Sequence, residues 1–198
     1  QTFRGALHAI PADPARVAYL AREDEADQLT RLNVASERAL REGTLGENGG
    51  GALAGFREVL KWKPGQPRAM QGLAAVESAM IRRAEEAALA SDFDTTRLWL
   101  DHAAKVREDA QTVADARVRV EAIRMARIAE LRDAGVRDMA TPLGLKEARV
   151  KLAEVLRIAE PGNRVAADFR QRIDLATHYG LFRPGQVFTD AMQGGGRG

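Results

Sequence analysis

The chain contains no cysteine among its 198 residues. This absence excludes disulfides, thiolate nucleophiles and cysteine-ligated metals. It leaves the compartment open, because many periplasmic proteins also lack cysteine. Aromatic residues are scarce as well, at 5 % of the chain, whereas alanine is abundant. Small side chains suit closely packed helices better than a β core, which is rich in aromatic and β-branched residues.

The chain also lacks an excess of charge of one sign, since 30 basic residues face 28 acidic ones. Nucleic-acid-binding domains display a basic stripe, so this balance argues against such a partner. No apolar run approaches the roughly 20 residues of a membrane span, and no signal peptide is visible. Because the sequence begins with Gln1 and not with methionine, we expect it to be part of a longer protein.

Residues that carry chemistry are few and scattered. None of the three histidines, His8, His102 and His178, has a metal-ligand partner three or four residues away. The three serines lie outside any nucleophile elbow. The acidic cluster within 23–27 lacks the glycine turn of a calcium loop, and we interpret it as a solvated helix face. We therefore expect no catalytic residue, metal or cofactor, and a helical hydrolase is the enzymatic alternative.

Turn and cap residues divide the chain into helices. Asp13 and Pro14 predict a helix start, and the apolar spacing continues to about Glu42. The glycine-rich stretches 43–51 and 194–198 lack the residue order of a phosphate-binding loop, so we interpret them as flexible joints.

The stretch 115–135 carries two apolar stripes on roughly opposite sides of a predicted helix. One stripe consists of Val118, Ala122, Met125 and Ala129, and the other of Val120, Ile123 and Leu131. A helix that is apolar on two sides is predicted to lie between neighbours, with a loop over 135–144. Trp62 and Trp99 are expected to pack against adjacent helices, with a role as peptide anchors as the alternative.

Three segments repeat one pattern of a small residue, a large residue four positions later and a third residue three positions after that. The segments place Ala52, Phe56 and Val59, then Thr96, Leu100 and Ala103, then Ala148, Leu152 and Val155 at these positions. Leu60 and Leu156 follow the first and last segments, and Pro64-Gly65 and Pro161-Gly162 end them. Small residues let a partner helix approach, and the large ones fill the groove beside it. The pattern predicts stacked helix pairs that cannot bury their apolar faces alone.

This pattern resembles the second helix of the tetratricopeptide family. The turn around Phe93, "DFD", resembles the family's Gly-Asp-Tyr turn. The copies begin at 52, 96 and 148, so they are spaced by 44 and 52 residues, which departs from the family's 34. The resemblance implies an all-α fold, a right-handed array of about three helix hairpins with a groove for a peptide or protein.

The end of the chain has a different character. Asn163 is predicted to cap a last helix with one apolar face, formed by Val165, Phe169, Ile173 and Ala176, as a capping helix needs. The tail "FRPGQVFTDAMQGGGRG" resembles the lead-in to domains of the formylglycine-generating-enzyme (sulfatase-modifying factor) type. The matching residues are Pro184, Gly185, Phe188, Asp190, Gly194 and Gly195.

The second resemblance implies a multidomain bacterial protein. Some members of that family begin with a serine/threonine kinase and a membrane span, which favours the periplasm over the cytoplasm. We divide the chain into an N-terminal helical segment (1–42), helix hairpins (43–163), a capping helix (164–180) and a linker (181–198). We expect a non-catalytic scaffold that docks or orients the downstream domain; an extracytoplasmic ligand-sensing region of a kinase is the alternative.

Overall fold

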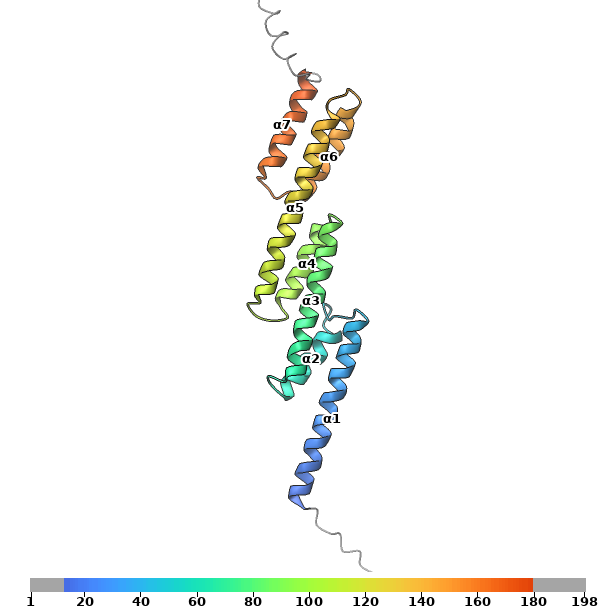
Figure 1. Ribbon diagram of the computed structural model, residues 1–198, viewed down its shortest axis with the longest axis vertical. Helices are drawn as coiled ribbons and strands as arrows, with labels where there is room; N and C mark the ends of the chain where they lie inside the picture. The colour runs from blue at the N-terminus through green and yellow to red at the C-terminus, as the bar shows by residue number, and fades with distance from the viewer. Residues whose placement is uncertain (1–12, 180–198) are drawn as a thin grey trace, which may run out of the picture. The chain divides into compact units, whose positions relative to one another are not determined.

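The computed structural model describes residues 13–179, which form seven α-helices and no strand (Figure 1). The helices are α1 (Pro14–Arg41), α2 (Gly51–Trp62), α3 (Pro67–Leu89), α4 (Phe93–Ala104), α5 (Gln111–Asp138), α6 (Gly144–Ile158) and α7 (Arg164–Tyr179). The predicted all-α class is confirmed. His8, the linker 181–198 and the tail residues that carry the second resemblance lie outside the described residues.

The chain divides into two compact units, and we describe each by itself. The first unit contains the residues up to Met80 together with His102–Glu108, and the second contains Ile81–Asp101 and the residues from Asp109 onward. Helices α3 and α4 therefore contribute residues to both units.

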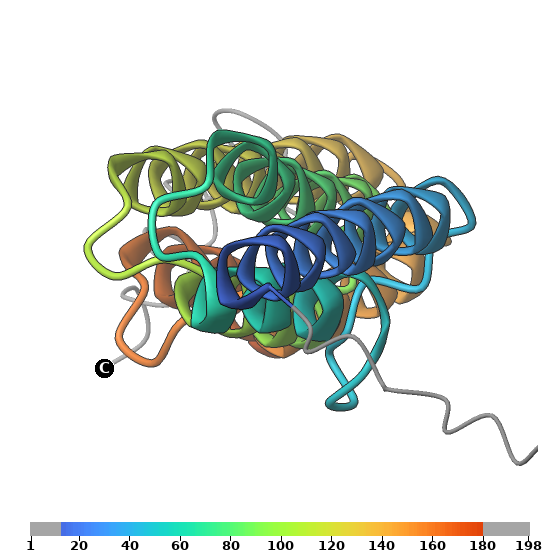
Figure 2. The ribbon, with the colours of Figure 1, turned by 90° about the horizontal axis from the view of Figure 1, so that it is seen from below.

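In the first unit, α1 packs along α2 (Figures 1 and 2). Phe56 of α2 is completely buried, and its ring lies against Gly72 of α3. A Cβ atom placed on Gly72 would lie 2.4 Å from the ring, far inside van der Waals contact. Gly55 faces the Ser36 hydroxyl of α1 in the same way. Glycine at these two positions is what allows the three helices to approach so closely.

In the second unit, α6 packs along α5, and α7 packs against both (Figure 1). Phe169 of α7 is completely buried, and its ring occupies the space where a side chain at Gly135 would lie. The sequence predicted a loop from Gly135 onward, and this prediction is wrong, because α5 continues to Asp138. Gly135 serves close packing inside the helix and does not end it.

The prediction that α5 is covered on both sides is also wrong. Val120 and Leu131 are buried and Ile123 is half-buried, but Val118 and Met125 of the other stripe are 71 % and 54 % exposed. Ala122 is exposed as well, and Ala129 is half-buried. Neighbouring helices cover one face of α5 only, and the second apolar stripe is left at the surface of the unit.

The two tryptophans differ in their surroundings. Trp62 is 62 % exposed and its Nε1–H donates to Glu58 of the same helix, so the predicted packing against a neighbouring helix is wrong for this residue. Trp99 is half-buried, with the Arg83 guanidinium 4.8 Å from its ring centroid. The stacked guanidinium explains how a large ring stays in place near the surface.

The glycine-rich stretch 43–51 is anchored, which differs from the predicted flexible joint. Leu45 inserts into the first unit with 1 % exposure, and its carbonyl accepts a hydrogen bond from the Leu53 amide at 2.9 Å. The Thr44 carbonyl accepts one from Ala52. These bonds tie the loop to the first turn of α2.

Helix caps follow the sequence closely. The predicted caps Asp13 and Asn163 accept hydrogen bonds from the amides of Ala15 and Ala166. Asp92 caps α4 by accepting from both the amide and the hydroxyl of Thr95. The hydroxyl bond first, then the amide bond and the positive charge of Arg157, lower the pKa of Asp92 from its ordinary 3.8.

The Thr95→Val substitution should therefore raise the pKa of Asp92 toward its ordinary value, because the hydroxyl donor is lost while the amide donor remains. Since the pKa in the folded state is depressed, the cap contributes stability above the unfolded value and loses it as the pH falls through the folded value. Carbon-detected NMR titration of the Asp92 carboxyl measures the change. An unmoved titration midpoint in the variant would show that the hydroxyl bond is unimportant.

Candidate interaction surface

The three predicted repeat segments coincide with the short helices α2, α4 and α6, which bury the same positions. The first position of each segment is buried, at Ala52, Thr96 and Ala148, and so is the last, at Val59, Ala103 and Val155. Phe56 and Leu100 are buried between them, and Leu152 is half-buried. The Thr96 hydroxyl remains satisfied because it donates to the Ala84 carbonyl of α3 at 3.0 Å.

The other predicted repeat residues lie nearer the surface, with one exception. Phe93 is 4 % exposed at the start of α4. Leu60 is half-buried and Leu156 is 45 % exposed, so neither holds a core position. Pro64 and Pro161 are exposed in the turns that follow α2 and α6. The buried part of the pattern is therefore its first eight residues.

The turns after the short helices each contain one residue with a positive φ. Gly65, Asp109 and Gly162 have φ values of 77°, 51° and 82°, in the left-handed region. In each case the carbonyl of the next residue accepts the first bond of the following helix, as in Met70 N–H to Gln66 at 3.0 Å. Pro-Gly marked the first and last of these turns in the sequence. The middle turn, with Asp109, carried no such signal.

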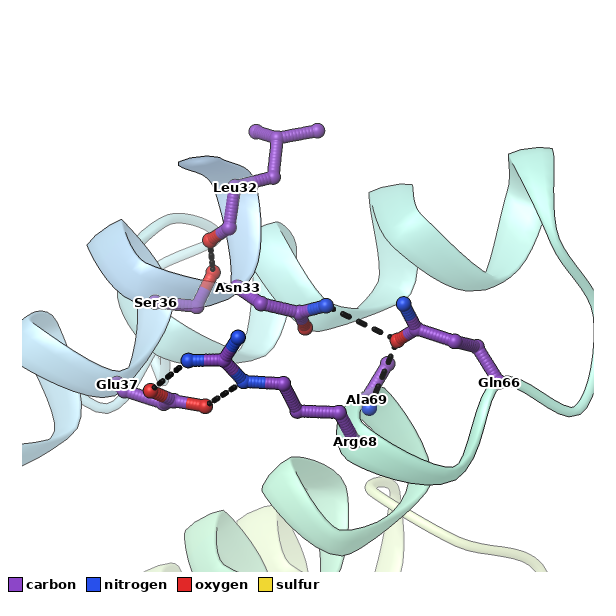
Figure 3. A network of polar contacts seen from close by, with 7 residues as sticks. All are labelled: Leu32, Asn33, Ser36, Glu37, Gln66, Arg68 and Ala69. Carbon is purple, nitrogen blue, oxygen red and sulfur yellow. Dashed lines mark hydrogen bonds and ion pairs between the residues drawn. The ribbon is translucent and has the colours of Figure 1, made fainter. Parts of the chain in front are cut away.

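A polar network joins α1 to the turn between α2 and α3 (Figure 3). Asn33 is completely buried, and its Nδ2 donates to Gln66 Oε1 at 3.0 Å. The same oxygen accepts from the Ala69 amide at 3.1 Å. Beside them, Arg68 binds both carboxylate oxygens of Glu37, at 2.6 and 2.8 Å. These hydrogen bonds hold the pKa of Glu37 below its ordinary value.

A second buried polar residue, Glu77 of α3, holds the turn after α4. Its side chain is 1 % exposed, and Arg107 donates to both carboxylate oxygens, at 2.8 and 2.9 Å. This bidentate contact raises the pKa of Arg107. A buried carboxylate requires such a partner, because its desolvation is otherwise uncompensated.

A third buried polar residue, Arg124 of α5, holds the end of α6. It is 9 % exposed, and its Nη1 donates to the Ile158 carbonyl at 2.6 Å. Its guanidinium lies 4.6 Å from the centroid of the Phe93 ring and 3.5 Å from a carboxylate oxygen of Glu160. Arg124 thus combines a salt bridge with a buried hydrogen bond and acts as an internal anchor. Each of the long helices α1, α3 and α5 thus has one buried polar side chain that fixes the end of a short helix or the turn after it.

One exposed apolar surface of the second unit is the uncovered stripe of α5. We call Val118, Ala122, Met125 and Ala129 the α5 stripe. Val136 follows Ala129 at i+7, so the stripe leads along the helix into a groove between α5 and α7. Val136, Met139, Ala140, Arg172, Leu175 and Ala176 line this α5/α7 groove, whose volume is about 320 Å³.

A second groove lies beside the α5 stripe, between the end of α3 and α5. Ala88, Leu89, Ile123 and Ala126 supply most of its apolar lining, its volume is about 510 Å³, and Arg127 and Glu130 border it. Leu89 is 74 % exposed. Since Ala126 follows Ala122 at i+4, the α5 stripe and this α3/α5 groove form adjoining surfaces. Their small side chains leave room for the backbone of a partner.

Charged side chains near this surface form ion pairs with one another within the second unit. Arg119 pairs with Glu85 at 2.7 Å, and Arg127 with Glu130 at 3.2 Å. Within residues 13–179, no group of three or more histidine and acidic residues is arranged to hold a metal ion. His102 and His178 lie on different helices, α4 and α7.

Two further findings concern membrane-spanning helices and similarity to known proteins. In the part of the chain that the structure describes, no helix combines the length and apolar character needed to cross a bilayer. Comparison with protein-family models, with curated proteins and with solved structures finds no match for the chain.

Proposed function

We propose that this chain is a tetratricopeptide-like scaffold without catalytic activity that binds a peptide or protein partner. Long and short helices alternate, and the three short helices bury the same repeat positions. The turns that follow them share one left-handed residue. This recurrence of position and turn is the observation that supports an array of hairpins with α7 as its cap.

The partner surface in this proposal is the α5 stripe with its two adjoining grooves. Val118 and Met125 are large apolar side chains that stay exposed on a helix whose opposite face is buried. Alanines surround them, so a partner helix can approach closely and bury its own apolar side chains in the grooves. An amphipathic helix is the ligand that fits such a surface.

The resemblance of the tail supports a second element of the proposal. A domain of the formylglycine-generating type would follow the array, and the array would dock or orient it. The tail lies outside the described residues, so this element rests on the sequence of residues 182–198. In this setting the chain belongs to a multidomain bacterial protein and acts in the periplasm.

Introducing a negative charge into the α5 stripe tests the binding function. Val118→Glu and Met125→Glu should each weaken partner binding at least tenfold, because each places a charge in an apolar contact. The matched control is Val150→Glu on α6, which is 61 % exposed and lies outside the α5 stripe. Binding is measured by titration calorimetry with a partner that is first captured on the immobilised chain.

Two results would count against this function. Equal affinity in all three variants would remove the α5 stripe as the binding surface. Turnover of ester, phosphate or glycoside substrates by the purified chain would remove the non-catalytic interpretation. Circular dichroism on each variant confirms that its helices are intact.

A further inference from the structure

The charged residues beside the α5 stripe are arranged symmetrically about Ala126. Asp115 and Arg137 lie eleven residues before and after it, and their charges are opposite. Arg119 and Asp133 lie seven residues before and after it, and their charges are opposite too. All five residues are exposed. Spacings of four, seven and eleven residues place them on one face of the helix, and we call them the charge row.

The charge row runs alongside the α5 stripe. Arg119 follows Val118 and Ala126 follows Met125, so each lies about 100° around the helix from a stripe residue. The row extends over roughly 33 Å of helix, at 1.5 Å per residue. A partner helix that covers the stripe along this length must also meet the charges of the row.

A helix that packs antiparallel across a two-fold axis meets its own sequence in reverse order. In such a contact residue i of one copy faces residue j of the other, and j faces i. A row on one side of the contact also meets the same row of the other copy. With the axis beside Ala126, Asp115 faces Arg137 of the other copy. Arg119 faces Asp133 of the other copy in the same way, so every charge of the row meets its opposite.

The same register brings the apolar residues of the two copies together. Ala122 and Ala129 lie four residues before and three residues after the axis, so they are nearly level across the contact. Val118 and Val136 lie eight before and ten after it, and Met125 lies beside the axis, near Met125 of the other copy. The register that pairs the charges therefore also covers the α5 stripe.

Contacts within the second unit leave the acidic residues and Arg137 able to form these pairs. Asp115 accepts from Gln111 at 2.9 Å and Asp133 accepts from Arg132 at 2.6 Å, each through Oδ1. Among residues 13–179, the second oxygen of each carboxylate accepts no hydrogen bond, and the Arg137 side chain forms no ion pair. A second copy can use both groups without breaking an existing bond.

We infer that the partner at the α5 stripe is a second copy of this chain, whose α5 packs antiparallel with the two-fold axis beside Ala126. The inference rests on the proposed function in taking the stripe as the interaction surface, and it names the occupant. A self-complementary contact requires charges that change sign about one point of the helix. A different partner protein imposes no relation between the two halves of α5.

Charge exchange at the outer pair tests the dimer and its register together. The outer pair is chosen because Arg119 is already bound to Glu85 within the unit. Asp115→Arg and Arg137→Asp each place like charges opposite one another at both ends of the contact, and each should weaken the dimer at least about tenfold. The double variant restores opposite charges and should dimerise like the unaltered chain. Sedimentation equilibrium measures the dissociation constants.

A mixture of the two single variants gives the strictest result. Asp115→Arg and Arg137→Asp in equal amounts should form a heterodimer as stable as the unaltered dimer, because both ends of the contact then carry opposite charges. Only the antiparallel arrangement has this property. The matched control is Arg170→Asp on α7, an exposed position where the same change in net charge should leave the dimer unaffected.

Three results would overturn the inference. One is a chain that stays monomeric up to roughly 100 µM, where even a dissociation constant weaker than micromolar is detected. Another is a loss of dimer that neither the double variant nor the mixture recovers. The third is an equal loss in Arg170→Asp. Circular dichroism on each variant confirms that its helices are intact.

The experiment contains no other protein, so its failure differs from failure of the proposed function. A monomeric chain would overturn the inference and leave the binding of a different protein to the α5 stripe intact. Turnover of a substrate by the chain would remove the non-catalytic interpretation and leave the dimer intact.

Discussion

Replacing Arg107 by methionine should lower the free energy of unfolding by about 3–5 kcal/mol, the cost of removing one member of a buried ion pair. The substituted side chain is itself only partly covered. The cost arises at Glu77, whose carboxylate is 1 % exposed and receives both guanidinium hydrogen bonds from Arg107. Urea unfolding followed by circular dichroism measures the loss.

The matched control for this prediction is Arg68→Met. Arg68 also binds both oxygens of a carboxylate, but its partner Glu37 has a side chain that is 32 % exposed. Water can solvate Glu37 once Arg68 is gone, so the loss of stability should be much smaller. Both arginines donate two hydrogen bonds to a carboxylate, and only the burial of that carboxylate differs. The comparison therefore separates the effect of carboxylate burial from the effect of losing the hydrogen bonds.

The double variant Glu77→Met/Arg107→Met provides the second control. Removing both charges leaves no uncompensated carboxylate, and buried ion pairs replaced by apolar residues are often neutral or stabilising. We expect the double variant to recover most of the stability lost in Arg107→Met. A double variant as unstable as the single one would show that Arg107 acts by packing and not by pairing with Glu77.

The buried polar residues of the long helices could not be predicted from the sequence. The buried positions of the short helices were predictable, because a small residue followed four positions later by a large one has a packing meaning in any helix pair. Asn33, Glu77 and Arg124 follow no such rule. A polar residue on a helix normally faces solvent, so burial of these three was not expected. The hydrogen-bond partner of each lies 30 or more residues away in the chain. Only the folded backbone brings the partners together.

Glycine caused a different kind of error. In a sequence, Gly135 followed by Thr141-Pro142 predicts the end of a helix. In the structure it is buried inside α5, because the ring of Phe169 occupies the side-chain space. That contact joins residues 34 positions apart, so local pattern could not have revealed it. The same pairing of glycine and phenylalanine occurs at Gly72 and Phe56, and two such pairs suggest what a search for further repeats should seek.

The candidate surface was predicted only in part. Two apolar stripes on α5 were evident from the sequence, and the expectation that neighbours cover both followed from treating them alike. Periodicity alone does not tell which of two apolar faces is covered. The exposed stripe has more alanine and fewer branched residues than the covered one. That difference is the signal that could have distinguished a binding face from a core face.

Truncation of Phe56 should be the most damaging apolar substitution in the first unit. Phe56 is completely buried between α2 and α3, and Phe→Ala substitutions at such sites cost about 3–5 kcal/mol through lost burial and the cavity left behind. The control is Trp62→Ala in the same helix, which removes a larger ring that is 62 % exposed and should change stability little. Comparable losses in the two variants would contradict the assignment of Phe56 to the core.

The partner of Phe56 supplies a stricter test. The sign of the stability change caused by substituting Gly72 should depend on whether the Phe56 ring is present. Gly72→Ala alone should destabilise by about 1–3 kcal/mol, since its Cβ would lie 2.4 Å from the ring and the buried ring has little room to move. In the Phe56→Ala background the ring is gone, and alanine is favoured over glycine inside a helix by about 1 kcal/mol. The same change at residue 72 should then be neutral or stabilising. If Gly72→Ala destabilises equally with and without the ring, the close approach of α2 and α3 through this pair is wrong.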